Sequence, residues 1–437
     1  MSAGWQPSGV RGLGVVPADW DTAALRQFTT FDTGWTPPTD NPLNFDGDVP
    51  WANISDLGPK ILDAPLRTVA SDAEGAARQR LVETGELLFS FKLSVGSVSM
   101  AGAPMHTNEA IARFSDSPSL LSRYAFYVLP VMVTRNCNFN IYGAPLLNRE
   151  LIRQAPVALP SIHQQGMIAD FLDRETAQID AMIEAQEQVV ARLTERRSST
   201  ITALVTGHAL GLPLTASGNP LLGEVPEGWE VGRFGRHTRI NGGQVDPGIE
   251  PWNEMILVAP NHVESGTGRL LALETAAEQG ADSGKYLVRK GQIVYSKIRP
   301  SLNKVTIAPQ DVLCSADMYG ITCLGDGDHR YFANFMLATP FHQYATMVSD
   351  RVKMPKINRE ELSAAPWLVP PVAEQTRIAD LVDATTRGLD TAISETRALS
   401  ALLHERREAL ITAAVTGRID PTTGIEQIAP TTKKEAS

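Results

Sequence analysis

An internal duplication is the feature that most constrains this chain of 437 residues. Residues 156–207 align without a gap on residues 366–417, and roughly two in five of the paired residues are identical. The openings of the halves also correspond, because several residues of 8–20 recur in order within 217–229. Solenoid repeats span only about 20 to 50 residues. The sequence therefore predicts two like modules in one pseudo-twofold molecule.

Each duplicated segment predicts one long helix. Apolar residues recur through residues 164–205 at steps of three, four and seven, which indicates a helix with one buried stripe. The second copy keeps the stripe from Ile378 to Ile411, although Gly388 lies inside it. Each helix should have about 40 residues and a length of roughly 60 Å. Globular helices average about a dozen residues, so the matched pair favours mutual pairing over burial in a larger core.

Proline and glycine mark the ends of both helices in the same way. Pro160 precedes the first helix, and Pro370 and Pro371 precede the second. Gly207 and Gly417 follow the last apolar turns as C-terminal stops. The two helices should therefore begin and end at corresponding positions.

The stretches between these helices mix short β-rich runs with turns. Strands are expected at 87–91 and 292–298, and short helices at 124–131 and 331–337. The scaffold recurs in both halves while the loops differ. Binding specificity usually resides on loops held by a rigid frame, so the pattern suits two recognition modules of one fold with different targets.

Composition limits the partners and the compartment. The chain has 39 basic and 49 acidic residues, a net charge of −10, which counts against a sequence-blind nucleic-acid coat but not against a local basic surface. Cys137, Cys314 and Cys323 lack the spacing of a zinc or redox site, so we expect structural thiols in a reduced, cytoplasmic protein. We expect no signal peptide and no membrane segment, because the apolar run near residues 124–133 is short and contains Pro130.

Local basic runs are the clearest binding signal. Residues 285–304 contain six Lys or Arg and no carboxylate, and residues 351–359 form a second run. Phosphate neutralisation requires such a concentration, although a merely solvated basic face would look the same. Arginine suits guanine through its bidentate fork, and lysine suits phosphate. The candidates in this half are Lys290, Ser296, Lys297, Arg299, Asn303, Lys304, Arg351, Lys353 and Lys356, with the loop Asn241, Gly242, Gly243 and Gln244.

The first half offers a less basic set. Its candidates are Gly34, Thr36, Ser90, Lys92, Thr107 and Asn108. Glycine permits close backbone approach to a phosphate, and Asn and Gln can pair with adenine edges. A plain hairpin turn explains the glycine loop of either half equally well. Trp35, Trp51 and Trp252 could touch bases, but core packing is the more frequent role of tryptophan.

No catalytic constellation is evident in the sequence. It contains no phosphate-binding glycine loop of the G-x-x-x-x-G-K-[ST] type, no dinucleotide fingerprint after a strand and no Asn-Pro-Pro-aromatic methyltransferase motif. The eight histidines are scattered singly, without metal-ligand spacing. We therefore expect no cofactor and no metal, with catalysis on another chain.

Several segments resemble one known family, the specificity subunit of type I restriction-modification systems. Residues 217–231 resemble the opening of its modules, and Glu374 and Gln375 with Ile378 resemble the entry to its conserved helices. The helix ends at 195–207 and 405–417 match as well, although His163-Gln164-Gln165 replaces the usual Glu-Gln pair in the first copy. The resemblance covers nearly the whole chain, in the order module, helix, module, helix.

The resemblance implies an α+β chain in which two α/β target-recognition domains are separated by two helices that form an antiparallel coiled coil. Each domain would read one half of a bipartite, asymmetric site in double-stranded DNA, and the helices would space the halves. The predicted boundaries are 1–156 and 226–366 for the recognition domains, 157–207 and 367–417 for the helices, 208–225 for the linker and 418–437 for a polar tail.

The resemblance also implies partner proteins. Two modification (methyltransferase) subunits would dock on the helical parts, and restriction subunits would join the complex. The docking candidates are Gln165, Asp173, Asp180, Arg196, Arg197, Gln375, Asp383, Asp390, Arg406 and Arg407.

Two other functions are compatible with parts of the pattern. A scaffold could use the paired helices to hold two protein-binding domains, and salt-sensitive, sequence-dependent DNA binding would exclude it. A methyltransferase with a similar recognition domain is the second alternative. The missing cofactor motifs argue against it, and a failure to bind S-adenosylmethionine would exclude it.

Overall fold

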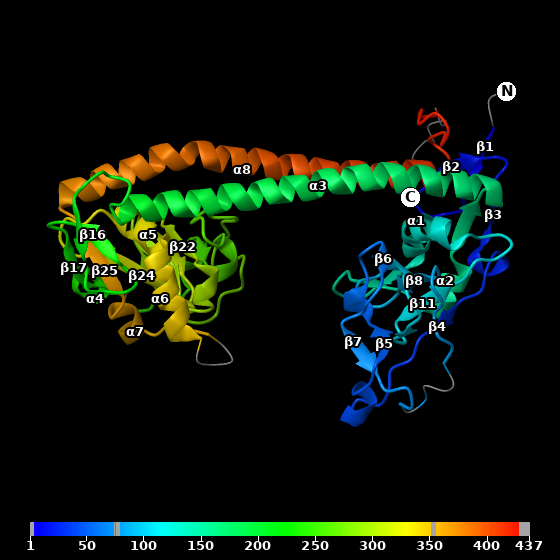
Figure 1. Cartoon of the computed structure of the whole chain (residues 1–437), viewed down its shortest axis with the longest axis horizontal. Helices are drawn as coiled ribbons and strands as arrows, with labels where there is room; N and C mark the ends of the chain where they lie inside the picture. The colour runs from blue at the N-terminus through cyan, green and yellow to red at the C-terminus, as the bar shows by residue number, and fades with distance from the viewer. Residues whose placement is uncertain (1–3, 74, 76–78, 241, 351–354, 428–437) are drawn as a thin grey trace. The chain divides into compact units, whose positions relative to one another are not determined.

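The computed structural model describes residues 4–73, 75, 79–240, 242–350 and 355–427. The chain divides into two compact units: unit 1 comprises residues 1–184 and 400–437, and unit 2 comprises residues 185–399. Each unit contains one β-rich module and a segment of each of the two long helices, α3 and α8 (Figure 1).

The long helices α3 (Ile162–Val205) and α8 (Val372–Val415) each have 44 residues. In unit 1 the start of α3 packs on the end of α8, where Ile179 and Ile183 meet Leu403. In unit 2 the end of α3 and the start of α8 share one core, which includes Val205 and Ile378. The helices run antiparallel within each unit. The predicted long helices and their packing against each other are confirmed.

Glycine ends both helices for a steric reason. Gly207 and Gly417 have φ angles of +82° and +71°, which L side chains rarely adopt. A Cβ atom on Gly207 would lie 2.2 Å from Cγ of Pro226, and one on Gly417 would lie 2.4 Å from Cγ of Pro17. The predicted glycine stops are confirmed at both ends.

The module of unit 1 is built on a five-stranded sheet of order β4-β11-β8-β9-β6, in which only β6 and β9 pair in parallel. A second sheet has the order β10-β5-β7, and β3 pairs with β14. Helix α1 packs on β8 and β9. The strands are β1 (Trp5–Pro7), β2 (Val15–Pro17), β3 (Asp21–Ala24), β4 (Asp32–Thr33), β5 (Val49–Ala52), β6 (Ile61–Leu62), β7 (Arg67–Val69), β8 (Leu87–Ser90), β9 (Val98–Ala101), β10 (His106–Thr107), β11 (Ile111–Phe114), β12 (Asn138–Phe139), β13 (Pro145–Leu146) and β14 (Pro156–Leu159); the helices are α1 (Ser122–Met132) and α2 (Arg149–Gln154).

The module of unit 2 repeats this plan around an antiparallel sheet of order β18-β24-β21-β22, with a second sheet of order β19-β23-β20 and the pair β17-β25. The strands are β15 (Leu214–Ala216), β16 (Glu224–Pro226), β17 (Glu230–Arg233), β18 (Thr238–Ile240), β19 (Leu257–Val258), β20 (Tyr286–Val288), β21 (Ile293–Ser296), β22 (Val305–Ile307), β23 (Val312–Cys314), β24 (Met318–Cys323) and β25 (Pro366–Val369). The helices are α4 (Phe234–His237), α5 (His329–Leu337), α6 (Thr339–Ser349) and α7 (Arg359–Ser363). The strand expected at 292–298 therefore ends earlier, at Ser296.

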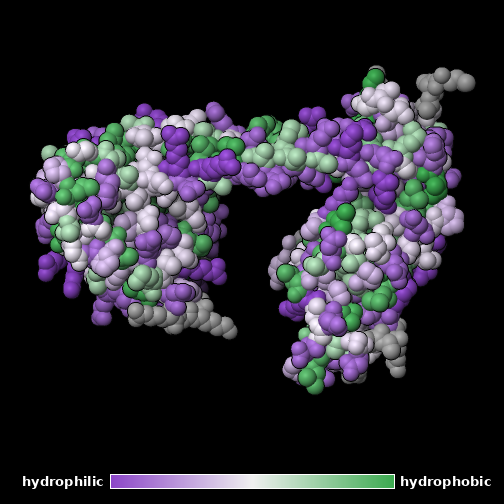
Figure 2. Space-filling model, in the orientation of Figure 1, coloured by the Kyte–Doolittle hydropathy of each residue, from purple (hydrophilic) through white to green (hydrophobic). Residues whose placement is uncertain are grey.

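Each core joins a sheet to both long helices. In unit 2 the fully buried Trp367 lies with its ring centroid 4.8 Å from that of Phe234 and 4.6 Å from that of Phe335. On the face drawn in Figure 2, hydrophilic and hydrophobic residues are interspersed over both units. No helix among the described residues combines the length and hydrophobicity that a bilayer crossing requires.

Candidate nucleic-acid interface

In unit 1, four predicted contact residues meet where the loop after β4 touches the end of β10. The N–H of Trp35 donates to the carbonyl of Thr107 over 2.8 Å. A Cβ atom on Gly34 would lie 1.9 Å from that carbonyl oxygen, so only glycine fits there. This close approach brings Gly34, Thr36, Thr107 and Asn108 together, although the Thr107 side chain itself is buried.

Glu109 connects this loop junction to Lys92. The Thr36 hydroxyl donates to the Glu109 carboxylate. Partial burial favours the neutral acid, but the Thr36 bond and the charge of Lys92 outweigh it and hold the pKa of Glu109 below its ordinary value. Glu109 is therefore ionised at neutral pH. A carboxylate can accept from the amino group of cytosine, so Glu109 is a candidate that a search for basic residues misses.

Two predicted serines hold turns together instead of facing solvent. Ser90 and Ser296 are buried at the ends of β8 and β21. Each hydroxyl donates over 3.0 Å to the carbonyl two residues further on, that of Lys92 or Ile298. Each bond closes the turn that follows its strand, and burial leaves both serines outside the exposed surface.

Aromatic rings gather two cations in unit 2. Nζ of Lys297 lies 5.8 Å from the centroid of the Tyr319 ring. The guanidinium of Arg359 lies 5.8 Å from the same ring and 6.0 Å from that of Tyr286. Cation–π attraction stabilises such positions without neutralising the charge. Arg359 belongs to the predicted basic run, whereas the two tyrosines carry no charge pattern that marks them in the sequence.

Arg299 and Lys356 adjoin this pair. The N–H of Arg299 donates to the carbonyl of Pro355 over 2.8 Å, and Ile298 forms an isolated bridge with Lys356. We call Lys297, Arg299, Lys356 and Arg359 the cation cluster of unit 2. Among the described residues, none of the four forms an ion pair. Four uncompensated cations on an acidic chain are suited to neutralise phosphates.

The other candidates of the predicted basic run have polar atoms engaged within the fold. Lys290 precedes β21, at the end opposite Lys297, and its N–H donates to Asp311 over 2.8 Å. Nζ of Lys304 donates to a backbone carbonyl over 2.5 Å, and the buried Asn303 amide does so over 2.9 Å. Asn303 and Lys304 support the turn that follows Arg299, whereas Lys290 supports the turn before β21.

The glycine loop of unit 2 is exposed. Gly242, Gly243 and Gln244 are solvent-accessible, and Gln244 lies against Gly284. Asn241, Arg351 and Lys353 lie outside the described residues.

Two glutamines predicted to dock partners are internal. Gln165 is fully buried, and its amide bonds to Leu121, Ser119 and Pro160. Gln375 is also buried, with bonds to Asp328 and Pro370. Because their polar atoms are occupied inside the fold, both glutamines fasten a module to the start of its helix and are not available to a partner.

Further along each long helix, ion pairs also attach the helix to the module of the same unit. In unit 1, Asp173 accepts from Arg123 over 2.9 Å and pairs with Lys60 at 2.8 Å. In unit 2, Arg330 binds Asp383 over 3.1 Å. The two arginines occupy the same position in α1 and α5, so the duplication preserves this contact.

A second repeated pair joins the two helices. Arg407 binds Asp180 over 2.7 Å in unit 1, and Arg197 binds Asp390 over 2.6 Å in unit 2. These aspartates and arginines were predicted to dock partners, and in the structure they pair with each other. The neighbouring Arg196 and Arg406 are exposed and form no ion pair with a described residue.

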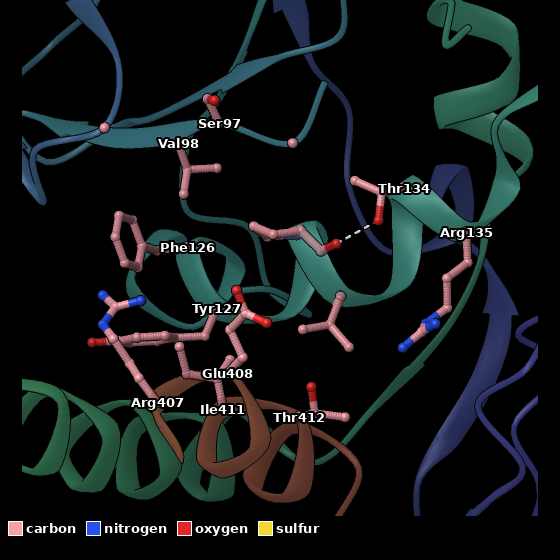
Figure 3. Close-up of a pocket in the computed structure, with 14 residues that line it drawn as sticks. Ser97, Val98, Phe126, Tyr127, Thr134, Arg135, Arg407, Glu408, Ile411 and Thr412 are labelled. Atoms are coloured by element: carbon pink, nitrogen blue, oxygen red, sulfur yellow. Dashed lines mark hydrogen bonds between the residues drawn. The ribbon is translucent and has the colours of Figure 1, made fainter. Parts of the chain in front are cut away.

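A pocket of about 500 Å³ opens in unit 1 between α1, β9 and the end of α8 (Figure 3). Phe126 and Tyr127 from α1 face Arg407 and Glu408 from α8 across it. None of its lining residues is a histidine or a cysteine. The pocket offers contact surface and carries no pair of groups arranged for acid–base or nucleophilic catalysis.

The described residues carry no metal centre. Among them, no group of three or more His, Cys, Asp or Glu side chains could hold a metal ion. Burial raises the pKa of Cys314 and of Cys323 to about 12, so both thiols stay protonated and unreactive.

Comparisons with known proteins agree on one family. Residues 17–191 and 255–398 match the family model described as type I restriction modification DNA specificity domain. The chain is 28% identical over 424 residues to the type I restriction enzyme EcoDI specificity subunit of Escherichia coli, covering 93% of this chain and 90% of the relative. It is 22% identical over 251 residues to the MjaIX specificity subunit of Methanocaldococcus jannaschii, covering 55% of this chain and 57% of that relative.

A solved structure shows the same fold. It is described as the structural basis underlying complex assembly and conformational transition of the type I R-M system. The match has a TM-score of 0.57 at 15% sequence identity and covers 92% of this chain and 99% of the solved chain. At this identity the likeness concerns the fold.

Proposed function

This chain belongs to the type I restriction-modification DNA specificity family, and on that premise we propose that its two units read the two halves of one bipartite DNA site. The chain is the DNA specificity subunit of such a system, and therefore a recognition subunit and not a catalytic one. The proposal adds that the module of each unit contacts its own half-site, and that the helices α3 and α8 separate the halves.

The cation cluster of unit 2 is the observation that carries this proposal. Lys297, Arg299, Lys356 and Arg359 are held by aromatic rings and backbone bonds while their charges stay free. Lysines and Arg359 would neutralise phosphates, and Arg299 would reach a guanine. In unit 1 we assign the same role to the junction of Gly34, Thr36, Asn108, Glu109 and Lys92.

We assign partner docking to the exposed arginines of the helices. Arg196 and Arg406 are equivalent in the duplication, and neither has an ion pair among the described residues. Two equivalent positions suit two copies of one modification subunit, with restriction subunits joining the assembly. The protonated thiols and the free cysteines agree with a reducing, cytoplasmic environment.

The salt dependence of DNA binding tests the role of the cluster. We expect Lys297→Ala and Lys356→Ala, each in the complex with modification subunits, to make the negative slope of log affinity against log salt shallower by about 0.9. Lys290→Ala is the matched control, because Lys290 lies at the opposite end of β21. Unchanged slopes for both cluster variants would remove these lysines from the interface. Binding without salt or sequence dependence would favour the scaffold alternative.

A further inference from the structure

The turns that follow β8 and β21 share one backbone design. Each begins with a buried serine, Ser90 or Ser296, whose hydroxyl closes the turn over 3.0 Å. The third residue after each serine is left-handed: Leu93 has φ +57°, and Arg299 has φ +47°. Leu93 in unit 1 is therefore the structural counterpart of Arg299 in unit 2.

A second left-handed residue completes the correspondence. Gly96 has φ +91° in the first turn, and Asn303 has φ +45° in the second, where the loop is one residue longer. Glycine and asparagine tolerate this region, but leucine does not favour it. Leu93 therefore keeps an unfavourable backbone conformation at a position where glycine would be relaxed.

The side chain of Leu93 also gains nothing from folding. It is 88% exposed, and its neighbours Lys92 and Ser94 are exposed as well. A large apolar side chain stabilises a fold only when it leaves water. Backbone strain of this kind concentrates at functional sites, so an exposed, strained leucine indicates a contact made outside the folded chain.

We propose that Leu93 determines base specificity in unit 1 by packing on the methyl group of a thymine in the major groove. The assignment rests on the proposed reading of DNA by both units. Thymine presents its methyl group in the major groove and guanine presents two acceptors, so leucine and arginine at one position select different bases. The residue that contacts the base thus occupies the same position in both turns. It is Leu93 in unit 1, for an A·T pair, and Arg299 in unit 2, for a G·C pair.

The surroundings of Leu93 favour DNA over a protein partner. Lys92 is exposed beside it, and the Lys92 charge acts on Glu109 at the loop junction. Protein-docking surfaces are usually contiguous apolar patches, whereas Leu93 stands alone between polar residues. A single methyl contact within a polar surface that includes an exposed lysine matches the major groove of DNA.

Removing the thymine methyl group tests the assignment. The complex of the full chain with modification subunits would be titrated with duplexes in which each thymine of the specific site is replaced in turn by uracil. We expect about fourfold weaker binding at one thymine of one half-site, the effect of one lost methyl burial. Leu93→Gly should bind the normal duplex about fourfold more weakly and be insensitive to that uracil, while the relaxed turn keeps the chain folded.

Two controls separate this contact from other roles. Leu146→Ala, which removes another exposed leucine of unit 1, should stay sensitive to uracil, and Leu93→Arg should shift the preferred pair at that position to G·C. Retained uracil sensitivity in Leu93→Gly, or a loss of modification-subunit binding with unchanged base preference, would overturn the assignment. Absence of any sequence preference in the wild-type complex would instead overturn the proposed function.

Discussion

Single charged residues attach loops to the long helices, and Glu264 shows this most clearly. Its carboxylate accepts from Arg397 of α8 over 2.5 Å, from Thr267 over 2.7 Å and from Arg269 over 3.1 Å, all within unit 2. Partial burial opposes ionisation, but these donors prevail and hold the pKa of Glu264 at about 2. The ion pair therefore links the loop after His262 to the helix.

The pH dependence of stability tests this link. Because the folded pKa of Glu264 lies below its unfolded value, the stabilisation is present above the unfolded pKa and is lost as pH falls toward about 2. We expect Glu264→Gln to lower the unfolding free energy by about 1 kcal/mol at neutral pH, a value limited by solvent screening around Arg397. Urea titrations should show this difference shrinking below about pH 4. A pH-independent difference, or an equal loss in the exposed control Glu254→Gln, would contradict the account.

At the level of single residues, the sequence predicts which residues carry a charge better than it predicts the burial and the neighbours of those residues. The carboxylate-free run predicted Lys297 and Arg299 as candidates, and the structure places both in one cluster, with Lys297 half-buried and Arg299 exposed. The sequence could not show that Ser296 is buried while the neighbouring Lys297 is partly accessible. Burial at the end of a strand depends on which residues of the sheet pack against it. Leu93 and Glu109 have no basic signal, and only the backbone angle and the neighbouring loop reveal them.

At the scale of elements, glycine has opposite effects at two positions of unit 2. Gly207 ends α3 at a positive φ and in contact with Pro226, whereas Gly388 lies inside α8 with open space around it. We expect Gly207→Ala to lower the unfolding free energy by about 1 to 2 kcal/mol or more, because it adds strain to a clash. Gly388→Ala should raise it by about 1 kcal/mol through helix propensity. Chemical denaturation would measure both, and changes of the same sign would contradict this explanation.

The elements were predictable to different degrees. The apolar stripe, the prolines and the glycines predicted both long helices, because these signals are local and repeated. No local sequence pattern predicted that β6 pairs with β9 in parallel. The same holds for the strand order of the two three-stranded sheets, which differs between the units. Strand pairing joins residues far apart in the chain, so the register of two paired strands cannot be predicted from a single sequence.

At the scale of the whole molecule, the duplication repeats the ion pair that joins α3 to α8. Asp180–Arg407 in unit 1 and Asp390–Arg197 in unit 2 are the same contact in the two copies. Each unit thus combines a module with one segment of α3 and one of α8. The central claim is that the two modules read separate half-sites whose spacing the helices set.

A paired heptad deletion tests this claim. Removing Ile183–Val189 from α3 and Ala398–His404 from α8 deletes one heptad between the flanking ion pairs of each helix and keeps Arg397. Each helix shortens by about 10 Å, which corresponds to about three base pairs. The most direct measurement is the set of DNA sequences methylated by the reconstituted complex, read for the wild type and for the deletion variant. We expect the same two sequence blocks with a spacer about three base pairs shorter, whereas an unaltered spacer or one continuous block would show that the helices do not set the spacing.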